Sequence, residues 1–126
     1  MSDAEEMLQQ WLGEHAEDQE ARFLLARILA WQDKRVEALA EYDRLLAEKP
    51  NNSDYLLGKS LVLVRGGQAQ AALPLLRKAR RLSPDYEDVW RLQVQALRAV
   101  GGESGKRQAR IVESGAGRRF PHSKQE

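Results

Sequence analysis

The 126-residue chain contains no cysteine, which excludes disulfides, thiol catalysis and cysteine-based zinc sites. Its two histidines, His15 and His122, lie near opposite ends of the chain and have no acid cluster at ligand spacing. We therefore expect both to be surface residues and predict no metal site. No serine stands in a G-x-S-x-G elbow. These absences predict a protein that is not an enzyme and uses no cofactor.

Long apolar runs are also missing. None approaches the roughly 20 residues that cross a bilayer, so we expect no direct membrane insertion. The formal net charge is only +1, which predicts no nucleic-acid partner. The N-terminus, MSDAEEMLQQWLGEH, is acidic and amphipathic, unlike a signal peptide. The compartment stays open: cytoplasmic as written, or periplasmic if the chain is a fragment of a longer exported protein.

Strand-forming residues are scarce, and helix-forming residues take their place. The chain is rich in Ala, Leu, Arg, Glu and Gln, while aromatic residues make up only 6%. Apolar residues recur at spacings of three and four, as in Leu25, Ile28 and Leu29. Breaker segments then divide the chain into about seven predicted helices, near 3–14, 20–31, 35–48, 53–65, 69–82, 86–100 and 105–118. The sequence therefore predicts an all-α fold.

The helices repeat in pairs. Pro50 and Pro84 are 34 residues apart, and aligning them superposes two units of helix, turn, helix and proline-led loop. Small residues then match small ones and large residues match large ones: Ala26 with Ser60, Ala38 with Ala72, Leu29 with Leu63, and Tyr42 with Leu76. A repeat of this length predicts a stacked array whose units bury a continuous core.

This period and pattern resemble the tetratricopeptide repeat (TPR). In that family, small residues at the eighth and twentieth positions let paired helices approach closely. Counted from Gln19, the first repeat has Ala26 and Ala38 there, and it departs from the family at Leu45, where a small residue is usual. Counted from Ser53, the second repeat matches with Ser60 and Ala72 and departs at Lys59, where an apolar residue is usual.

The third repeat starts at Glu87, with Trp90 on the family's aromatic fourth position. A three-residue insertion within 101–105 then brings Ala109 and Ala116 onto the twentieth and twenty-seventh positions. Before the first repeat, residues 3–14 match the second helix of a repeat whose first helix is not in this sequence. Ala4, Leu8 and Trp11 occupy its twentieth, twenty-fourth and twenty-seventh positions.

The resemblance implies a right-handed superhelix of antiparallel helix pairs. We predict one TPR domain over residues 1–126, made of a leading helix at 3–14, repeats at about 19–52, 53–86 and 87–121, and a weakly ordered basic tail at 118–126. The stretch LLARILAWQDKRVEALAEYDRLLAEKP also resembles bacterial TPR regions attached to outer-membrane export barrels or to cytochrome c assembly factors. That looser resemblance would make the chain a periplasmic fragment.

The stretch GGESGKR at 101–107 is similar to a phosphate-binding loop. Such a loop needs G-x-x-x-x-G-K-[ST] between a strand and a helix. Here Val100 stands where the first glycine belongs, and Arg107 stands where Ser or Thr would bind magnesium. We therefore predict that 101–105 is an inter-helix turn enlarged by about three residues.

In the TPR family, the first helix of each pair lines a concave groove. Carried over to this sequence, the groove has an apolar floor and several cations: Phe23, Arg27, Trp31, Leu57, Leu61, Val64, Arg91, Gln95 and Arg98. We expect it to bind a protein or peptide that is acidic and carries apolar anchors. The positions that hold a carboxylate-clamping Lys and Asn in some members are Phe23 and Arg27 here, so that kind of clamp is not expected.

The charge is unevenly distributed along the chain. Residues 1–21 hold seven acids and no Lys or Arg, whereas residues 101–126 hold six bases against three acids. One interpretation is that both ends are merely solvated. The alternative function is a self-assembling structural module that associates head-to-tail through its acidic and basic ends.

Overall fold

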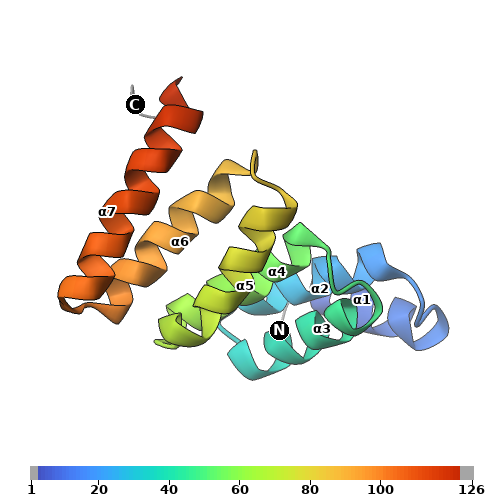
Figure 1. The fold of residues 1–126 in the computed structure, drawn as a ribbon. Helices are drawn as coiled ribbons and strands as arrows, with labels where there is room; N and C mark the ends of the chain where they lie inside the picture. The colour runs from blue at the N-terminus through green and yellow to red at the C-terminus, as the bar shows by residue number, and fades with distance from the viewer. Residues whose placement is uncertain (1–2, 123–126) are drawn as a thin grey trace.

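The computed structural model describes residues 3–122, which form seven α-helices and no strand. The helices are α1 (Asp3–Glu14), α2 (Gln19–Trp31), α3 (Arg35–Glu48), α4 (Ser53–Arg65), α5 (Ala69–Leu82), α6 (Glu87–Val100) and α7 (Gly102–Arg119) (Figure 1). The predicted all-α class is confirmed, and the first six helices begin and end within one residue of their predicted bounds.

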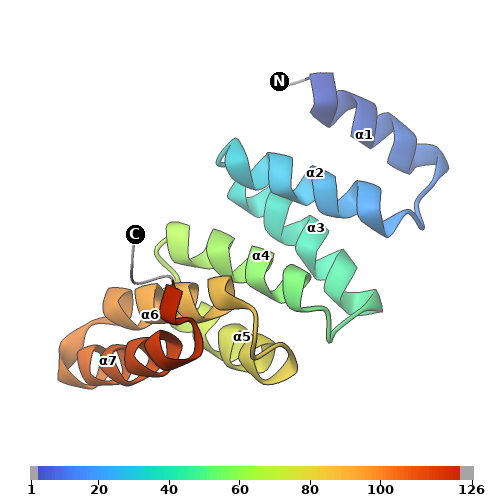
Figure 2. The ribbon, with the colours of Figure 1, turned by 90° about the horizontal axis from the view of Figure 1, so that it is seen from above.

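The helices stack in chain order as pairs: α2 with α3, α4 with α5, and α6 with α7 (Figure 2). Each helix contacts its neighbours in sequence, and the first helices of successive pairs also contact one another. The helix α1 lies at one end of the stack, beside α2, and α7 lies at the other end. This nearest-neighbour pattern is that of a repeat array.

Small residues at the helix crossings let each pair pack closely. Ala26 on α2 and Ala38 on α3 are fully buried, and they share one apolar cluster with Tyr42 and Leu45. A second cluster runs from α4 to α7 and contains Ala72, Leu76, Ala79 and Ala109, all fully buried. The small residues that the repeat pattern singled out therefore lie where two helix backbones come closest.

Two of the helix starts are capped by side chains. The Asp18 carboxylate accepts a hydrogen bond from the Ala21 N–H at 3.0 Å, and the Asn52 side-chain oxygen accepts one from the Tyr55 N–H at 3.1 Å. Caps of this kind satisfy backbone N–H groups that the first turn of a helix leaves without a partner. The bonds from Ala21 and from the Trp11 indole hold the pKa of Asp18 below its usual value. The loops before α2 and α4 thus determine where those helices begin.

The last helix differs from its predicted bounds. It starts at Gly102 rather than at residue 105, so the inserted residues form its first turn instead of an enlarged loop. Gly101 and Gly102 have φ of +80° and +72°, which glycine adopts without strain. Gly105 lies within the helix. A Cβ at this position would be 2.8 Å from the Leu97 carbonyl oxygen, so glycine allows α7 to approach α6 closely. Glycine at this position serves close packing, which composition alone cannot distinguish from a flexible turn.

The C-terminal segment is helical further than the predicted tail implied. Arg118 and Arg119 form the last turn of α7, and Arg119 pairs with Asp85 at 2.9 Å. Residues 123–126 of that predicted tail lie outside the described residues. The stretch GGESGKR follows the helix α6, not a strand, so the context that a phosphate-binding loop requires is absent from this part of the structure.

Candidate functional site

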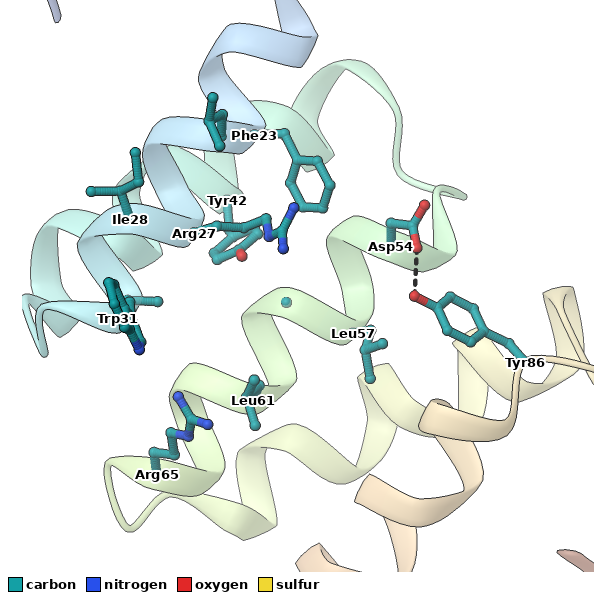
Figure 3. A pocket seen from close by; sticks show the side chains of 13 residues that line it. Phe23, Arg27, Ile28, Trp31, Tyr42, Asp54, Leu57, Leu61, Arg65 and Tyr86 are labelled. Carbon is teal, nitrogen blue, oxygen red and sulfur yellow. Dashed lines mark hydrogen bonds between the residues drawn. The ribbon is translucent and has the colours of Figure 1, made fainter. Parts of the chain in front are cut away.

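The main candidate site is a cavity of about 670 Å³ on the face formed by α2 and α4 (Figure 3). It lies between the first helices of two successive repeats, with Tyr86, the residue before α6, at its edge. Its lining is mostly apolar and includes Phe23, Ile28, Trp31, Leu57 and Leu61. Exposed apolar side chains on neighbouring helices are the usual material of a binding surface.

Five of the predicted groove residues meet at this cavity: Phe23, Arg27, Trp31, Leu57 and Leu61. The cavity also contains Ala30, Asp54 and Arg65, which occupy groove or rim positions of the repeat, and five residues that were not predicted: Leu24, Ile28, Tyr42, Gly58 and Tyr86. Leu24 and Ile28 were missed because the family's groove positions point elsewhere on α2. Tyr86 was missed because it belongs to a loop, and only the stacking of repeats brings it beside α4.

The other four predicted residues lie elsewhere. Val64 is buried in the second apolar cluster, so it supports the core instead of the groove floor. Arg91 and Arg98 line a separate cavity of about 680 Å³ between α6 and α7. Each is paired with an acid there, Arg91 with Glu87 at 2.7 Å and Arg98 with Glu113 at 2.8 Å. Gln95 is exposed on α6.

The α2–α4 cavity has a cationic end and an acidic end. Trp31 and Arg65 stand at one end, and the carboxylate of Asp54 accepts a hydrogen bond from the Tyr86 hydroxyl at 2.7 Å at the other (Figure 3). The Arg27 guanidinium lies over the Phe23 ring, 5.7 Å from its centroid. Within residues 3–122, neither Arg27 nor Arg65 forms an ion pair. Both guanidinium groups are therefore available to an acidic ligand.

Two tyrosines make up the inner walls. The Tyr42 ring is buried against Gly58 of α4, where a Cβ would come within 2.4 Å of the ring. Burial raises the pKa of Tyr42 to about 12. Burial and the hydrogen bond to Asp54 together raise the pKa of Tyr86 to about 12. Both hydroxyls are thus neutral at physiological pH and offer the cavity polarity without charge.

Residues 3–122 contain no group of three or more His, Asp or Glu side chains placed to hold a metal ion. His15 stacks on Trp11 with ring centroids 3.6 Å apart, and His122 is exposed at the far end. None of the helices described is long and apolar enough to cross a membrane.

Comparisons with known proteins agree with this architecture. A family model described as "Tetratricopeptide repeat" matches residues 1–61. No curated protein matches the sequence. Among solved structures, "MamA RS-1 ArsTM double mutant" is similar over 93% of this chain and 64% of its own, with TM-score 0.82 and 20% identity. "MamA 41-end from Desulfovibrio magneticus RS-1" is similar over the same shares, with TM-score 0.80 and 21% identity.

At these identities the likeness to the MamA structures concerns the fold alone. The chain spans about 64% of the length of those two structures. A protein-interaction or scaffold module is the role that the tetratricopeptide fold supports. The tetratricopeptide repeat model matches residues 1–61, and the structure has helix pairs stacked from α1 to α7, so the fold of the described residues is that of a tetratricopeptide repeat array.

Proposed function

We propose that this protein binds a segment of a partner protein in the α2–α4 cavity and catalyses no reaction. The single observation that carries the proposal is the exposure of Trp31, 86% of whose surface is open to solvent on the rim of an apolar cavity. Tryptophan is enriched among the residues that dominate protein interfaces. Because α2 and α4 are held by their own repeats, the cavity is preformed, and a ligand is not required to order it.

The lining defines the chemistry of the ligand. Phe23, Leu57 and Leu61 suit apolar anchors, while the unpaired Arg27 and Arg65 suit carboxylates. A peptide with two or more apolar side chains and an acidic group satisfies both. Arg91 and Arg98 are not needed for this interaction, because Glu87 and Glu113 already neutralise them.

The test is a selection of peptides from a random library on the immobilised chain, followed by fluorescence anisotropy with the enriched sequences. We expect acidic sequences with apolar anchors. The double substitution Arg27→Glu and Arg65→Glu should weaken their binding by about tenfold or more, and so should Trp31→Ala.

The matched control is Arg98→Glu, which reverses a charge in the separate α6–α7 cavity and should leave affinity within about twofold. Equal binding to wild type and to the Arg27/Arg65 variant would refute the α2–α4 site. Loss of binding in Arg98→Glu instead would restore the wider groove that includes α6.

The second candidate function is head-to-tail self-assembly. The observation that favours it is on α7, where Ile111 is 64% exposed beside Arg107 and Arg110, while α1 at the opposite end carries four acids and no base. Sedimentation equilibrium at low and high salt tests it, because assembly driven by these charges weakens as screening increases. A monomer at low salt and high protein concentration would refute it.

A further inference from the structure

A second apolar surface lies outside the cavity, at the N-terminal end of the array. Met7 and Trp11 on α1 are 68% and 47% exposed, and Leu24 on α2 is 47% exposed. The helix α1 contacts α2 and no other helix among the described residues. In the repeat pattern α1 corresponds to the second helix of a pair. The second helices α3, α5 and α7 each pack on the first helix of their own pair, whereas the corresponding side of α1 has no helix on it among the described residues (Figure 2).

The repeat itself shows what belongs on that side. Ala38, Tyr42 and Leu45 of α3 are buried against α2, the first helix of their repeat. The residues 34 positions earlier on α1 are Ala4, Leu8 and Trp11, and none of them is fully buried. The sequence thus keeps the small-large-large pattern of a helix-receiving face where no helix covers it.

The neighbouring helix completes the same surface. Tyr55 and Val62 of α4 are buried because the preceding repeat packs on them. Their equivalents on α2, again 34 residues earlier, are Ala21 and Ile28, and both are only half-buried. We refer to this surface of α1 and α2, comprising Ala4, Met7, Leu8, Trp11, Leu24 and Ile28, as the N-terminal slot.

We propose that the N-terminal slot binds an amphipathic helix of a partner protein, and that this helix carries positive charge on its outward face. We infer a helix as the occupant because α1 and α2 correspond to the surfaces that pack on a first helix elsewhere in the array. The helices α3 and α4 pack on α2 in this way, and α5 and α6 pack on α4. The apolar stripe of that helix needs a small residue opposite Ala4, as Ala26 provides opposite Ala38. The slot shares Leu24 and Ile28 with the α2–α4 cavity, and its other residues lie on α1.

The charge of the occupant follows from the acids around the slot. Asp3, Met7 and Glu14 are spaced at intervals of four and seven residues, which places both acids along the outer edge of the slot. The helix α1 carries no base, and among its acids Glu5 is already paired, with Lys34 at 2.8 Å. A second copy docking through the same face would bring two acidic edges together, so charge disfavours a symmetric dimer.

The experiment uses residues 1–126 and a labelled peptide with the sequence of α4, residues 53–65, stapled on its outward face to hold it helical. One version carries Asp54→Lys and is cationic. The other keeps Asp54 and carries Lys59→Glu, which makes it anionic. We expect saturable binding of the cationic peptide by anisotropy, and at low salt at least about fivefold weaker binding of the anionic one.

The variant Leu24→Lys places a charge in the slot at an exposed position, so the fold should persist, as circular dichroism would check. We expect it to weaken binding of the cationic peptide by about tenfold or more. The matched control, Val36→Lys, changes an exposed valine on α3 and should leave binding within about twofold.

Three outcomes would overturn the proposal. The first is the absence of saturable binding by the cationic peptide. The second is equal binding to wild type and to Leu24→Lys. The third is a dimer in sedimentation equilibrium that Leu24→Lys dissociates, because a second copy would then be the occupant. Since Leu24 and Ile28 also border the α2–α4 cavity, the peptide is tested against Trp31→Ala as well, which should weaken binding in that cavity but not in the slot.

Discussion

The two ends of this array present different surfaces to solvent. At the N-terminal end, α1 and α2 expose apolar side chains such as Met7 and Leu24. At the C-terminal end, the outward side of α7 is mostly polar, with Ile111 as an exposed apolar residue. The α3 residues that meet the following repeat are Leu39, Tyr42 and Leu46. The equivalent residues of α7, after the 34-residue period is applied twice and the three-residue insertion is added, are Arg110, Glu113 and Gly117.

This difference shows how one repeat pattern can both continue and terminate a stack. Charged side chains at the receiving positions of α7, with Glu113 paired to Arg98, cover the last repeat without another helix. The α1 face keeps its receiving residues apolar and remains suited to a further helix. Within the described residues, the face of α7 is charged where the face of α1 is apolar, and this contrast is the basis of the N-terminal slot.

The largest expected difference in stability is between substitutions at Tyr42, inside the array, and at Glu113 on α7, which occupies the same repeat position. Tyr42 is buried between α2 and α4, so Tyr42→Ala should lower the free energy of unfolding by about 3–5 kcal/mol. Glu113→Ala removes only an exposed ion pair and should cost less than about 1 kcal/mol. Chemical denaturation followed by circular dichroism measures both. Similar losses would mean that α7 does not end the array as described.

A smaller effect contrasts two helical glycines. A Cβ at Gly58 would meet the Tyr42 ring at 2.4 Å, so Gly58→Ala should destabilise the protein by about 1–3 kcal/mol. Gly13 on α1 has nothing within 4 Å of an added Cβ, so Gly13→Ala should be neutral or stabilise by up to about 1 kcal/mol. Thermal melts of the two variants sharpen the comparison between a packed interior and an open end. A stabilised Gly58→Ala would contradict the close approach of α4 to Tyr42.

The smallest effect concerns the hydrogen bond between Tyr86 and Asp54, which joins the loop before α6 to α4. Tyr86→Phe should cost about 0.5–1.5 kcal/mol at neutral pH. The folded state raises the pKa of Tyr86 to about 12 from an ordinary value of about 10, so it favours the neutral hydroxyl. Its contribution is fully present below pH 10 and is lost as the pH rises toward 12.

The measurement is the unfolding free energy from pH 8 to 12 for wild type and Tyr86→Phe. Part of the alkaline loss should remain in the variant, because burial also raises the pKa of Tyr42 to about 12. A variant whose pH dependence matches wild type would show that the Tyr86 hydroxyl does not titrate with folding.

Much of the fold was predictable because its determinants are local. The spacing of Leu25, Ile28 and Leu29 and the prolines at 50 and 84 each act within a few residues of the helix that they define. The candidate site was predictable only in part. Phe23 and Leu57 were found from their repeat positions, whereas the burial of Val64 depends on how a neighbouring repeat covers it.

The sequence by itself determined the seven helices, the period of the array and the small residues at its crossings, because periodicity and side-chain size act along one chain segment at a time. Only the tertiary structure decided which cations are free and which faces are covered. Arg27 and Arg98 were both predicted to line the groove, yet Arg98 meets Glu113, 15 residues further along, across the α6–α7 packing. Charge neutralisation and burial depend on contacts between helices, and no local pattern encodes them.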